Sequence, residues 1–164
     1  MYQLAHVVNT LLYKAKGVHK SISPMKIQKL VYFLYGEYLY REKEALFAER
    51  FEAWPYGPVI DDIYQSFKDY RDRPIRRYMP DATGDLRRIV LEDDPAFAYC
   101  FNSVWAKYGN KTGIELSKLT HDTRSAWYKA ASNGRTFLSD SDIQKEMEWR
   151  IREQGTTARG QARF

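Results

Sequence analysis

The segment that most constrains the fold is residues 25–40, which is apolar on almost every face of a helix. One stripe at helical spacing consists of Ile27, Leu30, Val31, Leu34 and Tyr38. The other faces carry Phe33, Tyr35 and Leu39. A helix that is apolar nearly all round is normally buried among several neighbours, so the segment predicts a central helix covered by the rest of the chain. Ser23 and Pro24 suit the N-cap and the first helical position, so we expect the helix to begin there.

The string Trp-Pro-Tyr-Gly-Pro-Val follows at residues 54–59. Its two prolines fix φ, and Gly57 permits backbone conformations that most residues cannot adopt. Residues 51–54 alternate in character and indicate a short extended segment. We therefore expect a short strand, a rigid corner, and a second amphipathic helix that Pro58 can start.

Helical periodicity recurs along most of the remaining chain. The expected helices are residues 4–16, 95–108 and 112–119, one through Trp127 that Thr123 or Ser125 caps, and one through Ile143, Met147 and Ile151. Between them, Ile75–Met79 and Ile89–Leu91 could pair as a small hairpin. The fold class that follows is mainly α: a compact single-domain helical fold around a buried central helix, with a short strand or small β-hairpin. We expect the domain to span residues 1–154 and residues 155–164 to form a flexible basic tail.

Composition limits the class of protein further. A chain of 164 residues with 44% hydrophobic residues can bury a sizeable core without disulfides. The single cysteine, Cys100, lies on the apolar face of an expected helix, which favours a buried core thiol over a nucleophile. No secretory signal and no membrane-spanning apolar run are visible, so we expect a soluble cytoplasmic protein without a membrane partner.

Recognisable catalytic motifs are absent from the sequence. There is no P-loop, no dinucleotide-binding glycine motif and no H-E-x-x-H zinc motif. His121 beside Asp122 allows a catalytic interpretation, but residues adjacent in sequence do not define a catalytic pair. The alternative is a histidine that bonds to the backbone at a helix junction. We expect no enzyme activity, no catalytic residues, no cofactor and no metal site.

The stretch from Tyr70 to Asp94 differs in composition from the rest of the chain, because its arginines alternate with aromatic residues, prolines and a glycine. Its candidate partner-binding residues are Arg71, Arg73, Arg76, Arg77, Tyr78, Arg87 and Arg88. Such residues can grip carboxylates or phosphates and stack on rings. The alternative is a solvated loop whose cations pair with nearby aspartates. A net charge of +5 suits an acidic partner, either protein or nucleic acid.

Several blocks of the chain resemble the Panacea domain, also known as the SocA-like or GepA family. They are Lys29–Phe33, Phe51–Trp54, Tyr56–Val59 and Leu116–His121, followed by Trp127. Their order and spacing match over roughly residues 4–150, although Ala126 stands where the family often has proline. The resemblance gives structural roles to the motif residues Trp54, Tyr56, Gly57, Pro58, Thr120, His121 and Trp127.

Functionally, the resemblance implies an antitoxin of a bacterial or prophage toxin–antitoxin module. Such a protein neutralises a cognate toxin, encoded by the adjacent gene, through direct protein contact. A first alternative is a proteolytic adaptor that delivers the toxin to the ClpXP protease. A second alternative, which rests on the basic charge, is a regulator that binds nucleic acid. An enzyme that uses His121 ranks last.

Overall fold

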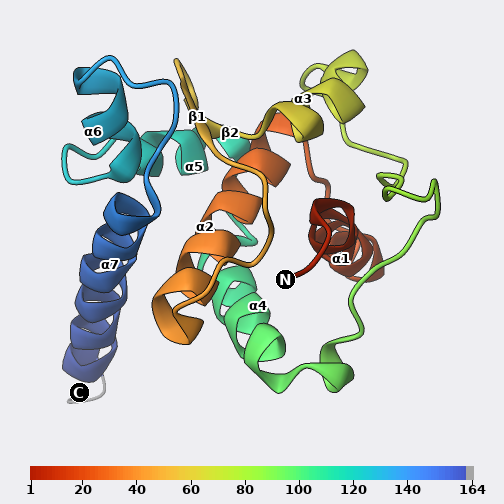
Figure 1. Cartoon of the computed structure of the whole chain (residues 1–164). Helices are drawn as coiled ribbons and strands as arrows, with labels where there is room; N and C mark the ends of the chain where they lie inside the picture. Colours follow the sequence, from red (N-terminus) through yellow and green to blue (C-terminus); the bar gives the residue numbers. More distant parts are fainter. Residues whose placement is uncertain (162–164) are drawn as a thin grey trace.

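The structure is a computed structural model that describes the backbone of residues 1–161 and the side chains of residues 1–155. Helix α2 (Pro24–Glu42) runs through the middle of the molecule, and the other elements pack around it (Figure 1). The other α-helices are α1 (Leu4–Gly17), α3 (Asp61–Phe67), α4 (Pro95–Tyr108), α5 (Gly113–Thr120), α6 (Ala126–Ser132) and α7 (Asp140–Gln161). The remaining elements are strands β1 (Glu52–Trp54) and β2 (Gly57–Val59) and the 3₁₀ turns η1 (Lys68–Tyr70) and η2 (Leu91–Asp93).

The central position of α2 confirms the expectation from its sequence. Every residue from Lys26 to Leu39 is buried, and the helix contacts α1, α3, α4, α5, α7 and β2. Ser23 is the N-cap, and its hydroxyl accepts a hydrogen bond from the Lys26 backbone at 3.2 Å. The helix ends at Glu42, and the C-cap residue Lys43 takes the left-handed conformation at φ 60°.

Local caps set the ends of the later helices. Asp94 caps α4 and accepts a bond from the Phe97 backbone at 3.0 Å, with Pro95 in the first turn. Thr112 and Glu115 form a capping box at α5. Ser125 caps α6, one of the two alternatives that the sequence left open. These boundaries follow from capping residues that sequence reading can recognise.

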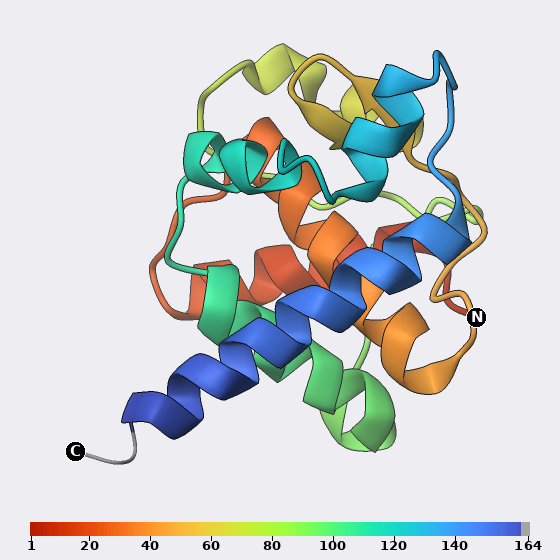
Figure 2. The ribbon, with the colours of Figure 1, turned by 90° about the vertical axis from the view of Figure 1, so that its left-hand side faces the viewer.

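A buried polar network joins α7 to the rest of the core. Glu146 of α7 is fully buried, and its carboxylate accepts bonds from the Tyr32 hydroxyl at 2.6 Å and the Ala126 backbone at 2.9 Å. Arg150 pairs with the same carboxylate at 2.8 Å and also donates to the Leu119 carbonyl at 2.6 Å. The network thus ties α7 to α2, α5 and α6. Figure 2 shows α7 crossing the face of the molecule in front of α2.

The structure corrects the hairpin expected between Ile75–Met79 and Ile89–Leu91. Both stretches are irregular or 3₁₀ in conformation. Their backbone donors bond instead to polar side chains of α1: Met79 donates to Asn9 Oδ1 at 2.8 Å and Ile89 to Thr10 Oγ1 at 2.9 Å. The hairpin of this fold is β1 paired antiparallel with β2.

The structure also corrects the expected start of the helix after the corner. Pro58 lies inside β2, and α3 begins three residues later at Asp61. Glycine at residue 57, with φ 113°, lets the chain reverse directly, so the string at 54–59 forms a tight hairpin.

The domain boundary expected at residue 154 falls inside α7. That helix continues to Gln161, so residues 155–161 of the expected tail have helical backbone. Residues 162–164 of the expected tail lie outside the described residues. Across the described part of the chain, none of the helices combines the length and the apolar character needed to cross a bilayer.

Candidate functional site

The family-motif residues converge on the β1–β2 hairpin. Three successive carbonyls of the hairpin each accept a bond from a side chain of α5, α6 or the junction between them. The pairs are Trp127 Nε1 with Trp54 O at 2.7 Å, His121 Nε2 with Pro55 O at 2.9 Å, and Ser117 Oγ with Tyr56 O at 2.6 Å. Because carbonyl oxygens at a turn otherwise depend on water, these bonds fix the hairpin against the α5–α6 junction.

Helix α2 holds the other side of the hairpin. Lys29 Nζ donates to the Pro58 carbonyl at 2.9 Å, and the Gln28 side chain both donates to and accepts from the backbone of Ile60 at 3.0 Å. Lys29 is 1% exposed, and this burial lowers the pKa of its ammonium to about 7. A buried amine that loses its charge near neutral pH can donate to a carbonyl without carrying an unpaired charge into the core.

Glycine is required at the tip because the hairpin approaches α2 and α5 closely. A Cβ atom on Gly57 would lie 2.5 Å from Thr120 Oγ1 and 2.9 Å from Lys29 Cε. Thr120 is fully buried, and its hydroxyl donates to the Ser117 carbonyl at 2.6 Å. The motif glycine and threonine therefore face one another across a contact without spare room.

His121 occupies the junction between α5 and α6. Its Nδ1 lies 2.6 Å from the Ser117 carbonyl oxygen, and its ring packs on Trp127 with centroids 4.1 Å apart. Both ring nitrogens thus face backbone carbonyls, the geometry of the junction role. Asp122 is engaged separately, and its hydrogen bonds with Arg124 lower the pKa of its carboxyl.

The clamped hairpin presents aromatic residues at the surface. Tyr56 at its tip is 68% exposed, and Tyr64 of α3 is 42% exposed. Trp54 packs against Tyr64 edge to face, with ring centroids 4.9 Å apart. The hairpin thus combines a fixed backbone with an exposed aromatic edge.

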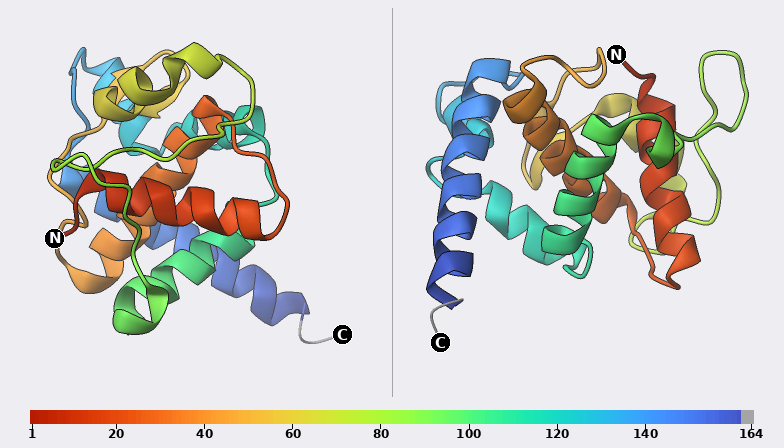
Figure 3. Two further views of the ribbon diagram at one scale, coloured as in Figure 1. Left: turned by 90° about the vertical axis from the view of Figure 1, so that its right-hand side faces the viewer. Right: turned by 90° about the horizontal axis from the view of Figure 1, so that it is seen from below.

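The candidate partner-binding residues lie elsewhere, on the segment between η1 and η2. In the part of the chain that the structure describes, none of them forms a hydrogen bond with the hairpin. Figure 3 (left) shows this segment, residues 71–90, lying along α1, and its right panel places the segment and α7 on opposite sides of the molecule. The sequence analysis missed the polar residues that hold it, which are Gln3 just before α1 and His6, Asn9 and Thr10 within α1. Asn9 is only 2% exposed and also donates to the Met79 and Arg87 carbonyls. Polar residues spaced three to four positions apart share one face of a helix, so the sequence did show that this side of α1 is polar.

The arginines of this segment divide into bonded and unbonded groups. Arg77 forms two bonds to the Asp69 carboxylate at 2.8 and 3.0 Å, which lower the pKa of that carboxyl. Arg73 donates to backbone carbonyls of η1. Arg71 and Arg76 are exposed, and their side chains have no hydrogen bond or ion pair within the described residues.

The second half of the segment is organised by Asp81. Its carboxylate accepts bonds from His6 at 2.9 Å and from the Thr83 hydroxyl and backbone, so the pKa of Asp81 lies well below its usual range. Arg87 pairs with Asp85 at 2.6 Å. Arg88 stacks over the Tyr13 ring at 3.9 Å, while Tyr78 is half-buried between the segment and α1. The pairing with nearby aspartates that the solvated-loop alternative describes is therefore present at Arg77 and Arg87, while Arg71 and Arg76 are exposed to solvent without an ion pair within the described residues.

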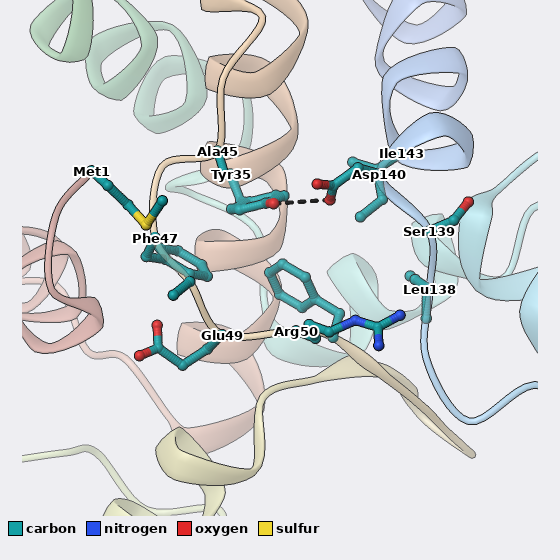
Figure 4. Close-up of a pocket in the computed structure, with 12 residues that line it drawn as sticks. Met1, Tyr35, Ala45, Phe47, Glu49, Arg50, Leu138, Ser139, Asp140 and Ile143 are labelled. Atoms are coloured by element: carbon teal, nitrogen blue, oxygen red, sulfur yellow. Dashed lines mark hydrogen bonds between the residues drawn. The ribbon is translucent and has the colours of Figure 1, made fainter.

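A separate hollow of about 470 Å³ lies between the loop after α2 and the start of α7 (Figure 4). Apolar residues such as Phe47 and Leu138 form its walls, and Tyr35 donates to Asp140 at 2.9 Å on one side. Arg50 and Glu49 belong to the same wall, so the hollow carries mixed charge.

Reactive groups are few in the described part of the chain. No three histidine, cysteine or acidic residues there are grouped so that they could hold a metal ion. Cys100 is fully buried, which raises the pKa of its thiol to about 12 and keeps it protonated. What the arrangement offers is a rigid scaffold with exposed arginines and aromatic residues, which suits binding.

Comparison with known proteins assigns this scaffold to a class. The family model for the antitoxin SocA-like, Panacea domain matches residues 27–128, which include most of α2, the hairpin and the α5–α6 junction. The chain therefore belongs to the SocA-like Panacea antitoxin family.

A curated relative gives the same assignment. The chain is 41% identical over 135 residues to a protein named Antitoxin SocA from Caulobacter vibrioides (strain NA1000 / CB15N). The match covers 80% of this chain and 72% of the relative. No solved structure matches the chain significantly.

Proposed function

We propose that this chain is an antitoxin that neutralises a cognate toxin by binding it directly and covering its working surface. The observation that best supports the proposal is the segment of residues 71–90, which displays arginines on a backbone held to α1 by buried hydrogen bonds. Arginine and tyrosine dominate binding hot spots, and a pre-ordered surface loses less entropy on association.

The proposed contact surface consists of Arg71, Arg73, Arg76, Arg77, Tyr78, Arg87 and Arg88. Arg71 and Arg76 are its first-choice anchors, because their side chains have no internal ion pair to give up on binding. Arg73 and Arg77 shape the surface through their bonds to η1 and Asp69. The net charge of +5 favours an acidic partner surface. The toxin would be encoded by the adjacent gene and the pair would act in the cytoplasm.

The test is co-expression with the adjacent open reading frame, followed by purification at moderate and high salt. Restored growth together with a complex that survives high salt is the expected result. Replacing the two unpaired arginines, Arg71→Ala with Arg76→Ala, should weaken the complex. The matched control is Lys118→Ala with Lys145→Ala, which removes the same charge at exposed side chains that also have no ion pair within the described residues.

Two other outcomes would each replace the proposal. If growth is restored while the toxin disappears and no complex forms, and if this requires ClpXP, the chain is a proteolytic adaptor. If the neighbouring product is not toxic and the chain elutes with nucleic acid that salt removes, a nucleic-acid-binding regulator takes its place.

A further inference from the structure

A second hollow, of about 340 Å³, lies beside the arginine-bearing segment. Its walls are the C-terminal half of α1, the connection from α1 to α2, and residues 74–78. The Ile75 backbone donates to the Ile22 carbonyl at 2.9 Å, which joins two of these walls. We call this hollow the basic groove.

The floor of the basic groove is aliphatic. Leu12 and Ile22 are 7% and 2% exposed, and Ile75 is half-buried beside them. Apolar surface at the bottom of a groove gains free energy when a partner side chain removes it from water. The volume has room for a few side chains of a short segment and is too small for a folded face.

The rim of the basic groove is cationic. Lys16 and Arg76 are exposed, and Lys20 is half-exposed with its Nζ 5.8 Å from the Trp105 ring. None of these three has an ion pair within the described residues, and no acidic residue lines the groove. Arg77 also lines it but is paired with Asp69. By contrast, the 470 Å³ hollow is lined by both signs of charge.

We propose that the basic groove binds a short acidic segment of the toxin, with an apolar side chain on the aliphatic floor and carboxylates at Lys16, Lys20 and Arg76. This inference rests on the proposed antitoxin function and specifies where and how the toxin is held. Unpaired cations around an apolar floor complement alternating acidic and apolar residues. Single-stranded nucleic acid would instead need a row of aromatic stacking surfaces, and among the described residues Tyr78 is the one aromatic residue that lines the groove.

The test measures binding of the purified toxin at physiological salt. The groove variant carries Lys16→Glu, Lys20→Glu and Arg76→Glu. The matched control carries Lys111→Glu, Lys118→Glu and Lys145→Glu, which change the net charge equally at lysines that also have no ion pair within the described residues. The groove variant should bind about 30-fold more weakly or worse, because three exposed pairs become repulsive, while the control stays within about threefold. Thermal melting of both variants establishes that they fold.

A photo-crosslinking amino acid in place of Ser21, which lines the groove, identifies the occupant. The crosslinked toxin peptide should contain several Asp or Glu residues, whereas the same probe in place of Lys118 should not capture it. A captured peptide without acidic residues would overturn the inference.

The remaining outcomes separate this inference from the proposed function. If the wild-type chain neutralises the toxin and the groove variant binds it equally well, the groove assignment is wrong and the antitoxin function stands. If the wild-type chain neither neutralises nor binds the toxin, the proposed function fails, and the inference fails with it. If the groove variant loses only co-purifying nucleic acid, the groove belongs to that ligand instead.

Discussion

The buried lysine beneath the hairpin gives the sharpest prediction. Lys29 has a pKa of about 7 in the folded chain, against 10.5 for the ordinary side chain, because burial disfavours its charged form. Between these two values the unfolded chain binds a proton that the folded chain does not. The contribution of Lys29 to the free energy of unfolding therefore rises with pH across this window.

The size of the effect follows from the two pKa values. From pH 7 to pH 9 the unfolded lysine stays almost fully protonated, while the folded one goes from half-protonated to neutral. Integration over this range gives about 2 kcal/mol of added stability from Lys29 alone. The pKa of Cys100 is raised in the folded chain, so this thiol makes stability fall with pH near pH 9. The pH dependence of wild-type stability therefore does not isolate the contribution of Lys29.

The assay is urea unfolding of the wild-type chain and of Lys29→Met at several pH values. Cys100 is present in both, so its contribution cancels in the difference. That difference in the free energy of unfolding should move by about 2 kcal/mol in favour of the wild type between pH 7 and pH 9. The exposed Lys118→Met serves as control and should give a flat difference. A flat difference for Lys29→Met as well would refute the reasoning, because the amine would then be charged in the fold.

Three further predictions concern two backbone conformations, at Gly57 and Lys43, and the loop that Asp81 organises. Gly57→Ala should lower the free energy of unfolding by about 3 kcal/mol, because φ is 113° and the new Cβ would clash with Thr120. The control is Gly17→Ala, which has open space around it and should not lower the free energy of unfolding. Urea unfolding of the two variants makes the comparison. Lys43→Gly should raise stability by about 0.5–1 kcal/mol, since Lys43 holds a left-handed φ of 60°; an unchanged melting temperature would count against this. Asp81 has a lowered pKa, chiefly through its bond with His6, so its stabilisation is complete above about pH 4 and is lost as pH falls below that value. Below that pH, the protection of residues 79–89 against hydrogen exchange, relative to the intrinsic exchange rate at the same pH, should fall in the wild type, and Asp81→Asn should remove this pH dependence.

Much of the candidate site could be located in the sequence without being explained by it. Trp54, Gly57, His121 and Trp127 were recognisable as motif positions, yet nothing in their spacing indicates that a side chain holds each successive hairpin carbonyl. Those partners come from helices more than 60 residues away in the chain. Pairings of that range depend on how the helices pack, which local patterns do not encode.

The basic groove could not be predicted from the sequence either. Arg76 was visible as a candidate, but Lys16 and Lys20 read as the cationic end of an ordinary helix. They become part of one surface only because the segment after η1 folds back along α1. The polar face of α1 that causes this was present in the sequence, although its partner was unknown.

The sequence by itself determined most of the helices, the start of the central helix at Ser23 and Pro24, and the buried centre. Apolar periodicity and capping residues act within a few positions of one another, so these features do not depend on the rest of the fold. Tertiary structure decided what the irregular segments do. Met79 and Ile89 could have paired with each other, but Asn9 and Thr10 satisfy their backbone groups instead. A buried backbone group must find some partner, and only the packed fold determines which partner is within reach.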